Sequence, residues 1–240
     1  MSKRKSEGKK RLDLNRALRI LKNAGMTDPK LKSDDPNVQI QSILDALCDL
    51  SIHDGLTGLV NATFFHAVLA REIERSLRTG RTCGLMVIDI DHFKNINDTY
   101  GHKTGDKAIQ AVAEHMKRSL RSMDTAARIG GEEFAIILPE CSQEDAINAA
   151  TRIHSMLNPL IVTIGDKNLQ LTTSVGLVWT NPNIPMSSIA LLSEADQEMY
   201  RAKRSGRGRL CYKQLDTTMV SNQERSALMT FPFKEGTDGR

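Results

Sequence analysis

The chain has 240 residues, of which 40% are hydrophobic and 4% aromatic, and its formal net charge is +4. This length suits one domain with extensions, and so mild a charge excess does not by itself indicate a nucleic-acid-binding protein. The four cysteines are widely spaced with no C-x-x-C pair, so we expect neither a zinc site nor a disulfide framework. No apolar run reaches the roughly 18 residues of a membrane span, and we therefore predict a soluble, cytoplasmic protein.

Residues 1–34 are predicted to form a basic tail and a short helix. Six of the ten residues 2–11 are Lys or Arg, which is typical of a solvated tail. Binding of this tail to an anionic surface is the alternative, although we do not expect contact with a membrane. Leu14, Leu18 and Leu21 have helical spacing and predict a helix over residues 12–24.

Residues 35–52 are predicted to form a second helix, the stalk. Its apolar residues are spaced three, four and three apart, as in an a/d seam: Ile40, Ile43, Leu47 and Leu50. Two interpretations remain open. The helix packs on its own domain, or it pairs with the same helix of a second copy.

Residues 53–213 are predicted to form one domain of alternating strands and helices, followed by a polar tail over residues 214–240. Asn61 and Gly80 are expected to cap a helix at its two ends, and Ser142 with Asp145 a later one. Strands are expected at 83–90, 125–129, 134–139 and 169–179, and helices at 61–80, 105–120, 142–157 and 187–206, with a short helix from His92. The order β-α-β-β-α-β predicts an α+β, ferredoxin-like domain with an antiparallel sheet and helices on one face.

Asp89 and Asp91 lie at the end of the apolar strand predicted at 83–90. Residues two apart in a strand point to the same side. A pair of carboxylates beside phosphate chemistry indicates Mg²⁺, which prefers oxygen ligands and often adds a backbone carbonyl. For Asp91 the alternative is that it caps the short helix from His92.

The stretch RIGGEEFAIILP, residues 128–139, predicts a tight hairpin. Gly130 and Gly131 are expected to adopt the positive φ that such turns need, and the turn is expected to set Glu132 opposite Asp89 while Glu133 points elsewhere. Two like charges this close are unfavourable unless a cation or a proton is present. The pattern therefore indicates a divalent-metal site on a palm-like sheet, of the kind that performs nucleotidyl transfer.

Several ordered motifs together resemble the GGDEF family of diguanylate cyclases, in the variant spelled GGEEF. They are DGLTGLVN at 54–61, DIDHFKNINDTYGHKTGD at 89–106, RIGGEEF at 128–134 and ADQEMYRAKRSGRG at 195–208. The resemblance implies a nucleotidyl-cyclase-like palm domain that condenses two GTP into cyclic di-GMP and two pyrophosphates across a homodimer interface. It also implies Mg²⁺ or Mn²⁺ as cofactor, two or more ions per active dimer, and no nucleic-acid partner.

The resemblance assigns the metal to Asp89, the backbone carbonyl of Ile90 and Glu132. Asp89, Glu132 and Glu133 are then the catalytic residues. Glu133 either contributes to the metal site or helps to activate the ribose 3′-hydroxyl, and the sequence leaves these two roles open.

For the substrate, the resemblance assigns guanine to Asn97 and Asp106. A carboxylate accepts from the N1–H and 2-amino groups of guanine, which adenine lacks, so Asp106 is expected to reject ATP. Without the resemblance, both would be loop or cap residues, and His102 has a structural role by default. The triphosphate is assigned to the backbone amides around His92 and Phe93 and to the side chains of Lys94, Lys203 and Arg207.

Arg121 and Asp124 form an R-x-x-D motif, and five residues separate it from Gly130. In the family this spacing implies an inhibitory site for the product cyclic di-GMP, to which Arg152 adds a second arginine. The alternative is an ordinary surface pair at a helix end.

Two departures and one alternative function complete the comparison with the family. Ala62 and Thr63 replace the usual arginines, so the salt links of those arginines to the stalk are not carried over, and the usual GRN ends here in Gly208. A non-catalytic cyclic di-GMP receptor that signals through its N-terminal helices is the alternative to the enzyme. Members of that kind usually lack the glycines or acidic residues, which this chain retains.

Overall fold

The computed structural model describes residues 14–26, 31, 33–164 and 167–213. The predicted basic segment and the tail over 214–240 lie outside these residues. Within them, no helix is both long and apolar enough to cross a membrane.

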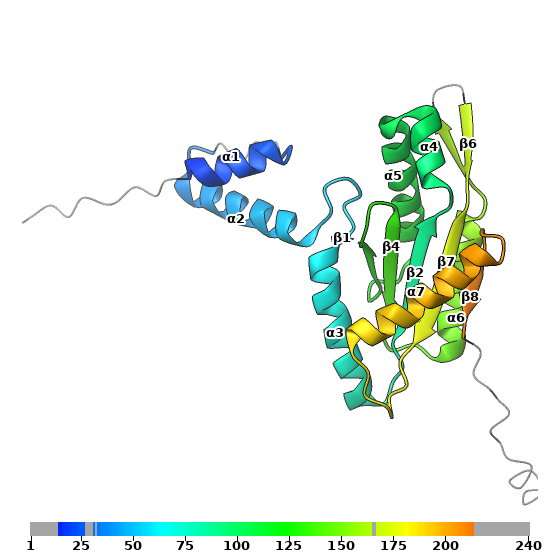
Figure 1. Cartoon of the computed structure of the whole chain (residues 1–240). Coiled ribbons are helices and arrows are strands. Elements are labelled where there is room, and N and C mark those ends of the chain that lie inside the picture. Colours follow the sequence, from blue (N-terminus) through cyan, green and yellow to red (C-terminus); the bar gives the residue numbers. More distant parts are fainter. Residues whose placement is uncertain (1–13, 27–30, 32, 165–166, 214–240) are drawn as a thin grey trace, which may run out of the picture.

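Helices and strands alternate along most of the chain (Figure 1). The helices are α1 (Asn15–Asn23), α2 (Pro36–Ile52), α3 (Ala62–Thr79), α4 (Phe93–Tyr100), α5 (His102–Ser119), α6 (Gln143–Leu157) and α7 (Ser188–Arg204). The strands are β1 (Val60–Asn61), β2 (Gly84–Ile90), β3 (Thr125–Arg128), β4 (Glu133–Leu138), β5 (Leu160–Ile164), β6 (Lys167–Leu171), β7 (Thr173–Trp179) and β8 (Leu210–Tyr212).

The main sheet has six strands in the order β1-β3-β4-β2-β7-β8. The four inner strands β3, β4, β2 and β7 are antiparallel to one another, whereas the outer strands β1 and β8 pair in parallel with β3 and β7. With the intervening helices, the inner strands form the β-α-β-β-α-β arrangement, which confirms the predicted α+β, ferredoxin-like fold. The short strands β1 and β8 and the separate β5–β6 hairpin were not predicted.

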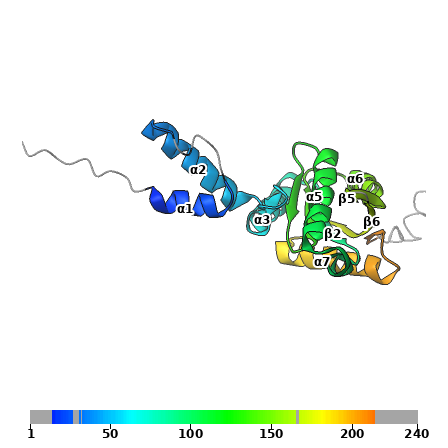
Figure 2. The same cartoon turned by 90° about the horizontal axis from the view of Figure 1, so that it is seen from above.

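Helices cover both faces of this sheet, so the expectation of helices on one face was wrong (Figures 1 and 2). The reason is the composition of β2, which is buried along its whole length. Met86, Ile88 and Ile90 belong to the core under α4, α5 and α6. Leu85 and Val87 belong to a second core under α3 and α7. A strand that is apolar on both faces needs a helical layer on each.

Local signals set the ends of the helices as expected. The Asn61 side chain accepts from the amide of Phe64 and begins α3, and Gly80, with φ of 70°, ends it. Ser142 and Asp145 form a reciprocal capping box at the start of α6.

The helix α7 lies directly against β7 at Gly176. A methyl group at this glycine would overlap the backbone of α7 at the Ala195 carbonyl and the Met199 amide. The absence of a side chain therefore lets α7 approach the sheet closely, and α7 carries Lys203 toward the end of β2.

The seam of α2 has a partner that neither interpretation foresaw. Ile43, Leu47 and Leu50 lie in an apolar cluster with residues of α1, such as Leu21. The two N-terminal helices thus pack on each other beside the sheet domain (Figure 2). Pairing of α2 with a second copy stays a prediction.

Candidate active site

Three polar residues stand side by side across the sheet at the end of β2. Asp89 pairs with Glu133 of β4 on one side and with Ser174 of β7 on the other. Directly opposed residues in antiparallel strands share a face, so these side chains lie on the side of α7. The register differs by one residue from the expected one, because Glu133 and not Glu132 lies opposite Asp89.

The hairpin at Gly130 and Gly131 owes its shape to space and not to positive φ, since neither glycine is among the residues of the described chain with positive φ. The amides of Ile129 and Gly130 both bond to the Glu133 carbonyl, which closes the turn. A side chain at Gly130 would overlap the Glu133 carboxylate. Gly130 therefore makes room for Glu133 to fold back over the turn.

Asp89 is a buried carboxylate, 5% exposed. Burial raises its pKa, while Lys203, whose Nζ lies 2.8 Å from Asp89 Oδ2, and the charge of Arg207 act in the opposite direction. The Lys203 ammonium group is thus paired with Asp89, which offsets part of the free-energy cost of burying this carboxylate.

Glu132 is coupled to Asp89. Burial and then the negative charge of Asp89 raise the pKa of Glu132, and Lys203 lowers it. The Glu132 carbonyl also accepts from the amide of Ile90, at 3.3 Å. Asp89, Glu132 and the Ile90 backbone therefore lie near one another at this edge, and their binding of a metal stays a prediction.

The donor set at this edge fits a hard divalent cation. Two carboxylates and a backbone carbonyl are the oxygen ligands that Mg²⁺ takes, and Mg²⁺ commonly keeps waters or substrate phosphates in its other positions. Across the described ranges, no group of three or more His, Cys, Asp or Glu side chains is arranged to hold a metal ion. Two carboxylates and one carbonyl would leave the other positions of a bound ion to water or to the oxygens of a phosphorylated substrate.

The N-terminus of α4 lies directly after β2. His92, with φ of 57°, is its N-cap residue, and no side chain caps the helix. The first amides of an uncapped helix are donors for an anion, which agrees with the assignment of His92 and Phe93 to a phosphate. Lys94 is exposed in the first turn.

Asn97 faces α5 across the α4–α5 turn. Its Oδ1 is buried and, among the described atoms, has no hydrogen-bond partner. A methyl group at Gly105 would overlap this oxygen, so the glycine gives it space. Asp106 is the next residue of α5 and is exposed. The structure thus brings the two predicted guanine residues to neighbouring turns.

Asp91 does not cap α4, so this alternative was wrong. The carboxylate is buried and accepts from the Thr172 hydroxyl, the Ser174 hydroxyl and the Gly208 amide. Sequence reasoning missed these partners, and the run Thr172-Thr173-Ser174 within the strand predicted at 169–179 was the available signal.

The three residues of the predicted inhibitory site also come together. Asp124 Oδ2 accepts from the Arg121 amide at 2.8 Å, and Arg152 of α6 donates to the Ser119 carbonyl. Burial raises the pKa of Asp124, against the charges of Arg121 and Arg152. This cluster precedes β3 and the hairpin follows it, and the four residues of β3 span about 13 Å.

Arg128 links the hairpin to the segment after α2, a link that sequence reasoning did not single out. It donates to the Gly131 carbonyl at 2.7 Å and to both carboxylate oxygens of Asp54 at 3.3 Å. Burial acts to raise the pKa of Asp54, but the hydroxyl and amide of Thr57 together with Arg128 outweigh it, so the pKa is lowered.

Because of this lowered pKa, the ionised Asp54 stabilises the fold at neutral pH, and acid removes this stabilisation. Because the folded-state pKa of Asp54 lies below its unfolded value, the stabilisation is complete above about pH 4 and is lost as the pH falls through the folded pKa. We expect Arg128→Gln to lower the free energy of unfolding at pH 7 by about 1–2 kcal/mol and by less at pH 3. Urea unfolding at both pH values measures this, with Arg78→Gln, at an exposed position of α3, as control. An equal loss at both pH values contradicts the role of Asp54.

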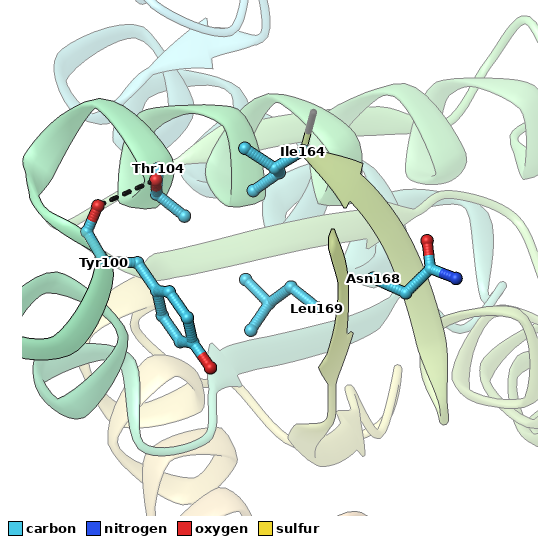
Figure 3. A pocket seen from close by; sticks show the side chains of 5 residues that line it. All are labelled: Tyr100, Thr104, Ile164, Asn168 and Leu169. Carbon is cyan, nitrogen blue, oxygen red and sulfur yellow. Dashed lines mark hydrogen bonds between the residues drawn. The ribbon is translucent and has the colours of Figure 1, made fainter. Parts of the chain in front are cut away.

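A cavity of about 370 Å³ lies elsewhere, between the α4–α5 turn and the β5–β6 hairpin. Figure 3 shows its lining, with Tyr100 and Thr104 on one side and Ile164, Asn168 and Leu169 on the other. None of these residues was predicted for the site, and none of Asp89, Glu132 and Glu133 lines the cavity, so the cavity is distinct from the carboxylate edge.

Fold and site together define a palm-like α+β domain with two carboxylates at adjoining strand ends. Residues 51–209 match the family model described as diguanylate cyclase, GGDEF domain, and the chain belongs to this family.

Among curated proteins, the chain is similar to a probable diguanylate cyclase, DgcC, of Escherichia coli (strain K12), with 39% identity over 160 residues, covering 67% of this chain and 43% of that protein. It is also similar to the diguanylate cyclase DgcP of Pseudomonas aeruginosa, with 38% identity, covering 67% of this chain and 24% of that protein. The chain therefore spans less than half the length of these relatives.

Two solved structures match a larger share of the chain than these relatives do. The coiled coil and GGDEF domain of DgcB from Caulobacter crescentus, in complex with c-di-GMP, has a TM-score of 0.69 at 28% identity and covers 84% of this chain and 100% of that one. The diguanylate cyclase SiaD from Pseudomonas aeruginosa, in complex with its activator SiaC, has a TM-score of 0.66 at 34% identity and covers 83% and 74%.

Proposed function

We propose that this protein is a diguanylate cyclase, which condenses two GTP into cyclic di-GMP and two pyrophosphates. The observation that carries the proposal is the buried Asp89, coupled in charge to Glu132 and contacted by Lys203, at the strand edge of a GGDEF domain. A non-catalytic receptor would not need to retain a costly pair of carboxylates at this edge.

The residues divide the work between binding and charge. Asp89, Glu132 and the Ile90 carbonyl hold a divalent cation, which supplies neutralisation of phosphate charge and activation of a hydroxyl. Lys203 and Arg207, with the α4 amides of His92 and Phe93, bind the triphosphate, and Lys94 reaches it from the same turn.

Base recognition belongs to Asn97 and Asp106. The buried Asn97 Oδ1 lacks a donor among the described residues, and a ligand N–H group at this position would remove the free-energy cost of that unpaired acceptor. Asp106 accepts from the guanine N1–H and 2-amino groups. Glu133 either joins the metal site or assists deprotonation of the 3′-hydroxyl.

Two copies must meet for the reaction, because each 3′-hydroxyl attacks the α-phosphorus of the GTP held by the other subunit. We propose a homodimer for this reason. Incubation with GTP and Mg²⁺ or Mn²⁺, followed by detection of cyclic di-GMP and pyrophosphate, tests the function. A flat trace at high protein concentration refutes it, and binding of cyclic di-GMP without turnover would favour the receptor.

Product inhibition is proposed for the cluster of Arg121, Asp124 and Arg152. A guanidinium that pairs with a phosphate or the guanine edge makes charge-assisted hydrogen bonds. Arg121→Ala is therefore expected to raise the inhibition constant of cyclic di-GMP at least about tenfold, while the initial rate without product stays unchanged.

The measurement is the initial rate as a function of added cyclic di-GMP. Arg118→Ala, on an exposed turn of α5 three residues away in sequence, is the matched control and should behave as wild type. An unchanged inhibition constant in Arg121→Ala would show that the R-x-x-D cluster is only a surface pair.

A further inference from the structure

Asp91 is a buried carboxylate, 4% exposed, to which the proposed function assigns no role. Its Oδ1 accepts from Ser174 Oγ at 2.7 Å. Its Oδ2 accepts from Thr172 Oγ1 at 2.8 Å and from the Gly208 amide at 2.9 Å. Asp91 therefore joins the end of β2 to the start of β7 and to the loop that follows α7.

That loop, residues 205–209, carries Arg207 and follows the last turn of α7, which carries Lys203. Arg207 has φ of 61°, a left-handed conformation that is unfavourable for a residue other than glycine. Its amide donates to the Ala202 carbonyl, which ties the loop to α7. The next amide, that of Gly208, donates to Asp91. A disfavoured backbone conformation persists only where its surroundings hold it, and Asp91 supplies such a contact immediately beside Arg207.

Asp91 is itself held in place by the segment that joins β6 to β7. The Asp91 amide donates to the Thr172 carbonyl at 2.9 Å, so both its backbone and its side chain are held at the β6–β7 junction. Thr173 is fixed in turn by Asn158, which accepts from its amide at 2.7 Å and donates to its hydroxyl at 2.9 Å. Hydrogen bonds to a buried carboxylate face little competition from water.

We propose that Asp91 is a positioning residue, which holds the loop of Arg207 against the end of β2 so that Arg207 and Lys203 face the phosphates of a bound nucleotide. The nucleotide rests on the proposed function, whereas the anchoring of the loop does not. Asp91 contacts the loop at the Gly208 amide and acts on Asp89 by charge, so the expected effect of losing its hydrogen bonds is on the loop and on substrate binding.

Two substitutions at Asp91 test the proposal. In Asp91→Ala, amide hydrogen exchange of residues 206–209 without nucleotide is expected to be at least about tenfold faster. The KM for GTP should rise by about tenfold while kcat changes less than about threefold, as for a loss of binding. Asp91→Asn should restore both values toward wild type. Its amide oxygen can accept from Thr172 and Gly208, and the Ser174 hydroxyl can turn to accept from its NH₂ group.

Ser76→Ala is the matched control. It removes another buried hydrogen bond, of 2.7 Å to Thr180, at the opposite end of the sheet, and should leave both the loop exchange and the KM unchanged. The proposal is overturned if Asp91→Ala behaves like this control, or if its loop loosens while the KM stays the same. Should Asp91→Ala fail to fold, Thr172→Val and Ser174→Ala remove the donors singly and should give smaller changes in the same direction.

The failure of the proposed function gives a different result. A wild-type protein that forms no cyclic di-GMP refutes the enzyme, and the affinity for tripolyphosphate then replaces the KM as the measure of the two cations. Equal tripolyphosphate affinity in wild type and Asp91→Ala would refute the positioning role.

Discussion

Glu132→Gln is expected to reduce the rate of cyclic di-GMP formation at least about a hundredfold, because it removes one charge from the site proposed to hold the metal. GTP binding should partly survive, since Lys203, Arg207, Asn97 and Asp106 remain. The measurement is turnover at saturating GTP and Mg²⁺ beside equilibrium binding of GTP. Full activity in this variant would refute the metal assignment.

The same substitution should not weaken the metal-free fold. Burial and Asp89 raise the pKa of Glu132. A carboxylate with a raised folded-state pKa lowers stability as the pH rises through that pKa, so the neutral Gln removes this loss at pH 7. The melting temperature without metal should therefore stay equal or rise, and Mg²⁺ should stabilise the variant less than wild type. Glu74→Gln, on the exposed face of α3, controls for the loss of a charge and should change neither value.

Gly176→Ala is expected to lower the free energy of unfolding by at least about 2 kcal/mol, or roughly 4–8 °C in melting temperature for a domain of this size. The added methyl group would overlap backbone atoms of α7, which cannot rotate away as a side chain can. If α7 moves outward instead, Lys203 leaves Asp89 and turnover falls as well. Thermal unfolding and the cyclase assay measure the two effects.

Gly55→Ala is the control for the general effect of replacing a glycine. A methyl group there meets no atom within 4 Å, so the change should stay within about 0.5 kcal/mol. Wild-type stability in Gly176→Ala would contradict the close contact between α7 and β7.

Much of the site could be predicted because the motifs lie on elements with strong local signals. The apolar run of β2 ends at Asp89, and glycines mark the hairpin before Glu132, so each residue could be placed at an element end. The predicted metal, phosphate and R-x-x-D residues form clusters in the structure for this reason. Their chemical roles are still predictions for the experiments above.

The wrong predictions concern which strands, helices or residues pack against a given element. The pairing of Asp89 with Glu133 depends on the register of β2 and β4, and one residue of shift changes the partner. The second helical layer depends on α3 and α7, which fall outside the β-α-β-β-α-β pattern. In the same way, the seam of α2 did not reveal that α1 would occupy it.

By itself, the sequence determined the helix caps at Asn61, Gly80 and Ser142, the buried strand β2, the hairpin and the family. These features depend on residues only a few positions apart. Only the tertiary structure decided the hydrogen-bond partners of Asp91, because Thr172, Ser174 and Gly208 are 81, 83 and 117 residues away. A buried carboxylate takes its function from the donors that the fold brings to it, and at such separations no local pattern specifies them.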